Sequence, residues 1–92
     1  MSNEVTLNPD ERRYEIHVDG TLAGFIKGRE DDGTVNLIHT EVFDEFAGRG
    51  LAAELVTGAL DDVRTRGKKV IATCPYVKRY IEKHAEYADL LA

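Results

Sequence analysis

The chain has 92 residues, enough for one folded domain spanning residues 1–92 and too few for two, because a chain of this length buries only about 60% of its unfolded surface. Hydrophobic residues make up 42% and charged residues 32%, which is typical of a globular protein and excludes disordered and collagen-like classes. Twelve basic and seventeen acidic residues give a net charge of −5, so we expect no nucleic-acid partner, which would require a broad positive surface.

The single cysteine, Cys74, can form no internal disulfide and has no second cysteine at metal-ligand spacing. This usage favours a reducing compartment and predicts cytoplasmic localisation. No apolar stretch approaches the roughly 18 residues of a membrane helix, so no membrane partner is expected. No metal site is predicted, because His84 has no second ligand at a suitable spacing.

Hydrophobic alternation with a period of two predicts antiparallel strands in the first half of the chain. The first clear strand is Arg13–Val18, and Asp19-Gly20 after it is the two-residue signal for a type I′ hairpin. Thr21–Lys27 forms the return strand, and an acidic turn leads to a third strand at Thr34–Val42. Glu4–Leu7 is a short candidate edge strand. The pattern predicts a three-stranded antiparallel meander.

The same alternation assigns faces to these strands. In Thr21–Lys27 it places Leu22 and Ile26 on one face and Ala23 and Phe25 on the other. In Thr34–Val42 the alternation predicts that four side chains share one face: Val35, Leu37, His39 and Glu41.

The period then changes to 3.6, which predicts a helix from Leu51 to Val63 with Gly67 as its stop signal. Val70–Thr73 is a short apolar run without alternation, the pattern of a strand buried on both faces and paired in parallel. Strand, helix and strand make a βαβ unit. Pro75 suits the first position of a second helix.

The segment Gly48-Arg49-Gly50-Leu51-Ala52 joins the third strand to the first helix. A glycine-rich turn at a helix N-terminus presents free N–H groups beside the positive end of the helix dipole, a suitable site for phosphate. In the alternative reading, the glycines only permit a turn. A Walker A loop is excluded because no Lys-Ser or Lys-Thr pair follows, and a dinucleotide-binding fold needs a larger parallel sheet.

Three motifs follow one another in order: His39–Val42 at a strand end, Gly48–Ala52 at a helix start, and Lys69–Val77 running from a strand into a helix. Together they resemble the GCN5-related N-acetyltransferase (GNAT) superfamily, and more narrowly its small single-domain branch. The resemblance extends from Tyr14 to Leu91. It implies an α/β (α+β) class, a minimal GNAT-like fold with a mixed, mostly antiparallel sheet and two main helices, and N-acetyltransferase activity.

The resemblance also implies a site for acetyl-CoA, which would serve as cosubstrate. The strands ending at Val42 and Cys74 would splay apart around the pantetheine arm, and the amides from Arg49 to Ala52 would hold the diphosphate. Ala47 departs from the superfamily signature, which has Gln or Arg at this position, so phosphate affinity is expected to be lower. The cofactor-binding residues implied are Val42, Phe43, Gly48, Arg49, Gly50, Leu51 and Ala52.

Acetyl transfer to an amine needs a base that removes a proton and an acid that protonates the departing thiolate. His39 and Glu41 lie two residues apart on one strand face, so either could accept the proton directly or through water. The competing readings are a hydrogen-bonded core histidine for His39 and a solvated strand end for Glu41.

Cys74 lies where a strand ends and the Pro75 helix begins, beside a helix dipole that favours thiolate. It is a candidate acyl carrier, base or redox group, or simply a small buried hydrophobe. The resemblance makes Tyr80 the candidate general acid, although its helical position is equally suited to a core residue, and Tyr76 is a rival.

Asp19-Gly20 directly joins two strands that a pair of helices separates in larger superfamily members, where those helices cover the acceptor. The acceptor is therefore expected to be a small-molecule or protein amine of open identity. The chain is expected to be a monomer or weak homodimer. The competing hypothesis is a non-catalytic CoA-binding or protein-interaction module.

Overall fold

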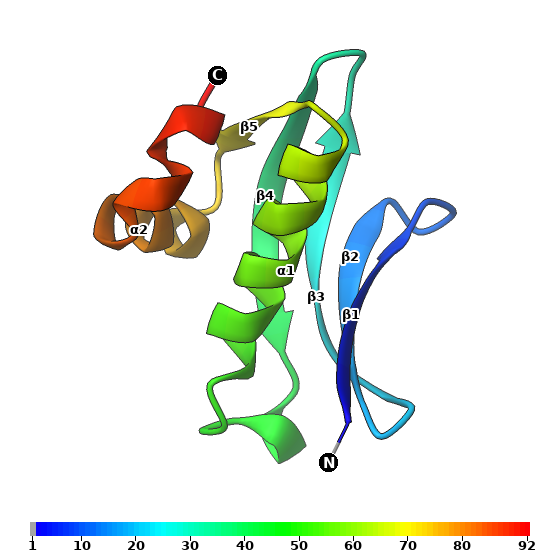
Figure 1. Ribbon diagram of the computed structural model, residues 1–92. Coiled ribbons are helices and arrows are strands. Elements are labelled where there is room, and N and C mark those ends of the chain that lie inside the picture. Colours follow the sequence, from blue (N-terminus) through cyan, green and yellow to red (C-terminus); the bar gives the residue numbers. More distant parts are fainter. Residues whose placement is uncertain (1) are drawn as a thin grey trace.

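The computed structural model describes residues 2–92 as one sheet with two main helices (Figure 1). The elements in chain order are β1 (Asn3–Asn8), β2 (Arg13–Val18), β3 (Thr21–Glu30), β4 (Thr34–Val42), the 3-10 helix η1 (Asp44–Phe46), α1 (Leu51–Thr65), β5 (Lys69–Ala72), α2 (Pro75–Lys83) and the 3-10 helix η2 (Ala85–Leu90).

The five strands pair in the order β1-β2-β3-β4-β5. The first four are antiparallel and β5 is parallel to β4, so the mixed, mostly antiparallel sheet and the βαβ unit formed by β4, α1 and β5 are confirmed. The candidate edge strand is also present as β1. The hairpin at Asp19-Gly20 has positive φ at both residues, 48° and 86°, as a type I′ turn requires.

The core lies between α1 and one face of the sheet, and α2 packs beside α1 at the β4–β5 end (Figure 1). The approach of α1 to β1 is close, since a methyl group added at Gly58 would lie 2.7 Å from Cβ of Val5. Each large apolar side chain buried here contributes about 1.5–3 kcal/mol. The largest fully buried side chains are Ile16, Ile26, Leu37, Leu55, Leu60, Val35, Val56, Val63, Val70 and Val77.

A β-bulge in β3 changes the faces predicted for that strand. Ala23 is an extra residue between Leu22 and Gly24, which oppose consecutive residues of β2. Ala23 and Ile26 are both buried, whereas Leu22 and Phe25 are only half-buried. The prediction that Leu22 shares a face with Ile26 is therefore wrong, because the bulge reverses the alternation at Ala23.

A second bulge lies in β4 at Ile38, since Leu37 and His39 oppose consecutive residues of β3. Leu37 is buried in the core, whereas the side chains of His39 and Glu41 are 59% and 50% exposed. The prediction that Val35, Leu37, His39 and Glu41 share one face is wrong beyond Leu37. The bulge turns the last two side chains to the sheet face opposite α1, which we call the open face.

The strand β5 is buried on one face only. Val70 is fully buried, but Ile71, which points away from α1, is 42% exposed, so burial on both faces is a wrong prediction. The cause is position, because β5 lies at the edge of the sheet and neither helix covers its open face.

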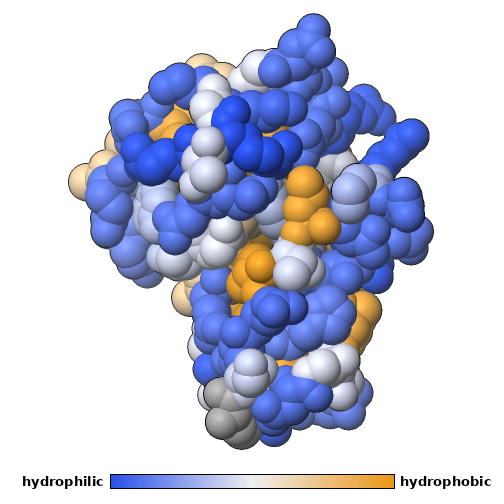
Figure 2. Space-filling model, turned by 45° about the vertical axis from the view of Figure 1, so that its right-hand side comes forward, coloured by the Kyte–Doolittle hydropathy of each residue, from blue (hydrophilic) through white to orange (hydrophobic). Residues whose placement is uncertain are grey.

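With the β1–β2 side turned forward, most of the visible surface is hydrophilic and apolar atoms form small separate patches (Figure 2). Within residues 2–92, no helix is long and apolar enough to span a bilayer.

Candidate functional site

The site begins where β4 and β5 separate. Their parallel ladder ends at the pair Leu37 and Ala72, after which the Cys74 N–H donates a hydrogen bond of 2.8 Å to the Leu37 carbonyl. β4 continues to Val42 with β3 as its strand partner on the other side. A gap therefore opens along the last residues of β4, and their backbone groups on this edge have no strand partner within residues 2–92.

The glycine turn stands at the N-terminus of α1. Gly48 and Gly50 have φ values of 80° and 73°, in the left-handed region that favours glycine. Gly50 is the N-cap residue and supplies no capping side chain, so the first-turn N–H groups that follow it have no intrahelical partner. The Arg49 guanidinium lies 5.4 Å from the centroid of the Phe46 ring. The backbone conformation required of an anion-binding turn is thus present.

A pocket of about 360 Å³ lies between the first turn of α1 and the exposed side of α2. Two basic side chains, Arg79 and Lys83, contribute to its wall. Through Ala53 the pocket adjoins the first turn of α1, which follows the glycine turn. The lining residues are Ala53, Tyr76, Arg79, Tyr80, Lys83 and His84.

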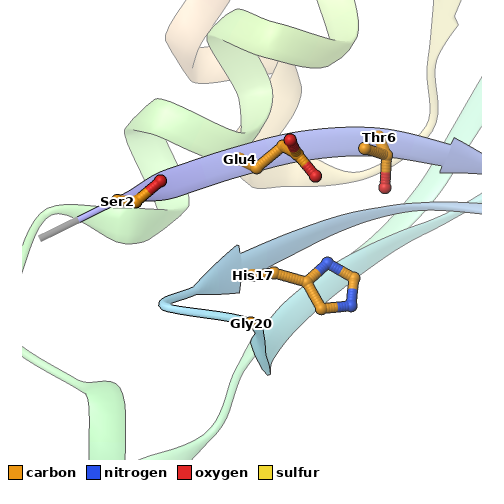
Figure 3. A pocket seen from close by; sticks show the side chains of 5 residues that line it. All are labelled: Ser2, Glu4, Thr6, His17 and Gly20. Carbon is orange, nitrogen blue, oxygen red and sulfur yellow. The ribbon is translucent and has the colours of Figure 1, made fainter.

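A second pocket, of about 380 Å³, lies on the open face at the other end of the sheet (Figure 3). Glu4 and Thr6 reach it from β1 and His17 from β2, and Ser2 and Gly20 complete its wall. None of the residues predicted from the sequence to be catalytic or cofactor-binding lines it. The candidate site is therefore the region of the glycine turn, the strand gap and the α1–α2 pocket.

Cys74 is 4% exposed and lies at the N-terminus of α2, where its sulfur is 3.4 Å from the hydroxyl oxygen of Thr40. Burial alone would raise the pKa of the thiol. Hydrogen bonds from Thr40 and from the N–H groups of Val77 and Tyr76 outweigh burial and lower this pKa below its usual value. The sequence argument for a thiolate-stabilising position at this helix start agrees with the geometry.

His39 and Glu41 form a pair on the open face, with Nε2 of the imidazole 3.4 Å from a carboxylate oxygen. The prediction that these two side chains share a strand face is confirmed, and the reading of His39 as a core histidine is wrong because of its exposure. Two rings of this face border the pair, since Phe25 packs edge-on against His39 and Phe43 at centroid distances of 6.5 and 6.2 Å.

Tyr80 lies between the helices. Its hydroxyl is hydrogen-bonded to the hydroxyl of Thr57 in α1. The single proton of Thr57 is donated to the Ala53 carbonyl at 2.9 Å, so Tyr80 is the donor to Thr57. The Tyr80 ring is stacked on His84 at 3.9 Å. This arrangement fixes the Tyr80 ring at the pocket wall and directs its proton toward α1.

The structure brings the predicted catalytic residues to two sides of the β4–β5 region. Cys74 and Tyr80 lie on the helix side, and the His39–Glu41 pair lies on the open face. Sequence reasoning assigned no role to Thr40, although it lies within the His39–Val42 motif, or to Thr57, because their partners are distant in the sequence. It also missed the cations of α2, for which the only signal is a basic helix beside a glycine turn. Within residues 2–92, no cluster of three His, Cys, Asp or Glu side chains is arranged to hold a metal ion.

Comparison with known proteins agrees with this geometry. Residues 13–90 match the family described as GCN5-related N-acetyl-transferase. Protein NATD1 of Danio rerio is 34% identical over 95 residues, covering 97% of this chain and 86% of the relative. Protein NATD1 of Xenopus tropicalis is 43% identical over 51 residues, but that alignment spans 55% of this chain and about half, 47%, of the relative.

Solved structures show the same architecture. A GCN5-like protein of Staphylococcus aureus is similar with a TM-score of 0.72 and 29% identity, covering 100% of this chain and 91% of that chain. A ribosomal-protein-alanine N-acetyltransferase of Brucella melitensis shares the fold with a TM-score of 0.59 at 22% identity, over 87% of this chain and 62% of that chain. On its sequence match along most of its length and on this shared architecture, the chain belongs to the GCN5-related N-acetyltransferase family.

Proposed function

We propose that this chain transfers an acetyl group from acetyl-CoA to an amine acceptor. The observation that carries the proposal is the position of the glycine turn: α1 begins at Leu51, after β4 has separated from β5. A helix N-terminus suited to a diphosphate therefore adjoins a strand edge with free backbone groups. Coenzyme A combines a diphosphate with an extended arm that contains amide groups.

The glycine turn fits the diphosphate of the cosubstrate. Beyond the adjacent residues of the chain, no heavy atom lies within 4 Å of the position that a Cβ would take at Gly48 or Gly50, so the space over the turn is open to a ligand. The N–H groups from Arg49 to Ala52 would bind the phosphate oxygens. Because Ala47 supplies no charge, the cations would be Arg49 in the turn and Arg79 and Lys83 of α2.

The free edge of β4 fits the pantetheine arm. An extended chain with alternating amide N–H and C=O groups can pair with such an edge like an added strand. Successive residues of a strand direct their main-chain groups to opposite edges, and the Phe43 N–H donates to the Ala23 carbonyl of β3 at 2.9 Å. Of Glu41, Val42 and Phe43, Val42 would therefore supply the main-chain groups for this pairing. Val42 and Phe43 pack against the core and thereby fix this end of the strand.

Bound acetyl-CoA supplies the activated acetyl thioester. On the open face, the His39–Glu41 pair would accept the proton of the incoming amine, since both groups are exposed and adjacent. On the helix side, Tyr80 would donate a proton to the departing thiolate after its hydroxyl rotates away from Thr57. Cys74 is the candidate for a covalent relay, because its thiolate is favoured by Thr40 and the start of α2.

A second function, binding of CoA without transfer, is favoured by two features of the helix side. Cys74 is nearly buried, and the Tyr80 proton is donated to Thr57 rather than to the gap. The two functions share the glycine turn and differ in the consequences of removing Glu41 or Cys74.

Calorimetric titration with CoA and acetyl-CoA tests the binding half of the proposal. Saturable binding is expected for the wild type and for Gly20→Glu, and no binding for Gly50→Glu. The two variants are matched, because both glycines have positive φ, but Gly20 lies in the β2–β3 hairpin and only Gly50 lies in the glycine turn at the start of α1. Release of free CoA thiol in the presence of spermidine or lysine methyl ester then tests transfer. Saturable binding without any release of CoA thiol, in the wild type and in Glu41→Gln alike, would support the non-catalytic function.

A further inference from the structure

One lysine lies beside the His39–Glu41 pair. Lys27 is directly opposite His39 in the β3–β4 ladder. Residues directly opposite in an antiparallel pair project from the same face, with their Cβ atoms about 4.5–5.5 Å apart. Phe25, two residues before Lys27, packs against the His39 ring, so this side of β3 is the open face. The amine of Lys27 and the candidate base therefore share one exposed surface.

The ammonium group of Lys27 is unpaired. It makes no salt bridge or side-chain hydrogen bond with any residue from 2 to 92, and the residue is exposed. Its other cross-strand neighbour is Arg13, whose guanidinium lies 2.7 Å from Glu15 and 4.7 Å from the Phe25 ring centroid. Two like charges directly opposite each other on a sheet are unfavourable, and conversion of the ammonium to an amide removes this repulsion.

Of the other four lysines, two are hydrogen-bonded and two lie in α2. Lys68 binds Glu30 and the Asp31 carbonyl, and Lys69 binds the Asp89 carbonyl at 2.7 Å. Lys78 and Lys83 belong to α2. Lys69 shares a face of β5 with Ile71, but its amine is hydrogen-bonded. Among residues 2–92, Lys27 is therefore the lysine on the open face whose amine has no partner.

The Lys27 side chain can span most of the distance from β3 to the β4–β5 gap. A ligand arm in the gap would take the place of a strand beside β4, two strand spacings or roughly 10 Å from β3. Five single bonds of about 1.5 Å each give a lysine stem that covers more than half of this span. An attacking amine needs to come within about 3–3.5 Å of the reacting carbon, which closes most of the remainder.

We infer that Lys27 is acetylated within the same chain, from the open-face side of the β4–β5 gap; this inference rests on the proposed acetyl-CoA site. The Lys27 nitrogen attacks the carbonyl carbon of the acetyl thioester, an N–C bond forms and the C–S bond breaks. The ammonium loses two protons in this step. One passes to the His39–Glu41 pair and on to water, and the other protonates the departing CoA thiolate. The products are Nε-acetyl-lysine at position 27, CoA with a free thiol, and one proton.

The test is incubation of the full chain with acetyl-CoA, followed by intact mass and peptide mapping. One added acetyl group that resists hydroxylamine is expected at Lys27, because hydroxylamine cleaves a thioester on Cys74 but leaves an amide intact. The gain should be absent in Lys27→Arg and present in the matched control Lys78→Arg. It should be more than about tenfold slower in Gly50→Glu, which loses the site that holds the donor. The rate constant should not depend on protein concentration.

Two results would overturn the inference. One is acetylation of Lys27 no faster than that of Lys78, which would be background chemistry of acetyl-CoA with surface amines. The other is a rate constant that rises with protein concentration, which would mean transfer between chains. If acetyl-CoA binds saturably and spermidine is acetylated while Lys27 stays unmodified, the inference fails and the proposed function stands. If acetyl-CoA does not bind, both fail.

Discussion

The hydroxyl oxygen of Thr40 lies 3.4 Å from the sulfur of Cys74, and this contact joins the end of β4 to the start of α2. The contact crosses the region where β4 and β5 separate. Thr40 therefore links the two sides of the gap and also favours the thiolate form of Cys74. The two residues are 34 positions apart in the sequence.

The first prediction concerns this contact. Thr40→Val removes a hydrogen bond that lowers the pKa of Cys74, so the thiolate should form at higher pH than in the wild type. Ultraviolet absorbance of the thiolate during a pH titration measures the midpoint. Thr73→Val is the control, because Thr73 is adjacent to Cys74 but bonds to Asn36 at 2.6 Å instead. An unchanged midpoint in Thr40→Val would show that the contact does not set the pKa.

The second prediction concerns the proposed base. Glu41→Gln keeps the shape of the side chain but removes its capacity to accept a proton, so acetyl transfer to spermidine should fall by about 10²-fold or more. The affinity for CoA should stay unchanged, because the side chain faces the open face and not the glycine turn. Glu45→Gln in η1 is the matched control. Equal transfer rates in both variants would remove Glu41 from the mechanism.

The third prediction concerns stability at acidic pH. Hydrogen bonds from Arg66 and Lys68 lower the pKa of Glu30 to about 2, against an opposing effect of burial. A carboxylate with a lowered folded-state pKa stabilises the fold above its unfolded value, near 4.3, and this stabilisation is lost as the pH falls toward 2.

Urea unfolding of Glu30→Gln at several pH values tests this effect. Because both partners are partly exposed, we expect a loss on the order of 1 kcal/mol at pH 7 that shrinks toward zero near pH 2. Glu11→Gln is the control, since the Glu11 carboxylate makes no hydrogen bond or ion pair within residues 2–92 and only its backbone N–H bonds to Asn8. A loss of the same size at every pH would mean that packing and not ionisation is responsible.

The fourth prediction concerns the approach of α1 to β1. In an exposed helix interior, Gly→Ala stabilises by about 1 kcal/mol. At Gly58 the added methyl would lie 2.7–2.9 Å from Val5 side-chain atoms, so Gly58→Ala should destabilise by about 1–3 kcal/mol. In a Val5→Gly background the same change should become neutral or stabilising. Chemical unfolding of the double-mutant cycle measures this reversal, and additive effects would contradict the close contact.

Much of the fold could be predicted because its signals are local. Asp19-Gly20, Gly67 and Pro75 mark element ends by their own backbone preferences, and the helix face from Leu51 to Val63 follows from apolar periodicity. The two bulges could not be predicted in this way. Alternation assumes an unbroken register, whereas the extra residues at Ala23 and Ile38 are accommodated by pairing with strands elsewhere in the chain.

The candidate site was predicted where it depends on backbone conformation and missed where it depends on contacts between elements. The positive φ values at Gly48 and Gly50 follow from residue type. The placement of His39 and Glu41 on the open face depends on the bulge at Ile38, and the role of Thr40 depends on a contact with a distant helix. No spacing pattern in the sequence indicates that Thr40 contacts Cys74.

The central claim is that CoA binds with its diphosphate at the start of α1 and its arm along the free edge of β4. Titration of isotope-labelled chain with CoA, followed by the NMR shifts of the backbone amides, tests it most directly. The account predicts that the largest shifts occur at Arg49–Ala52, with a second group at Glu41–Phe43. Saturable shifts confined to the pocket lined by Glu4, Thr6 and His17, or no shifts at all, would contradict it.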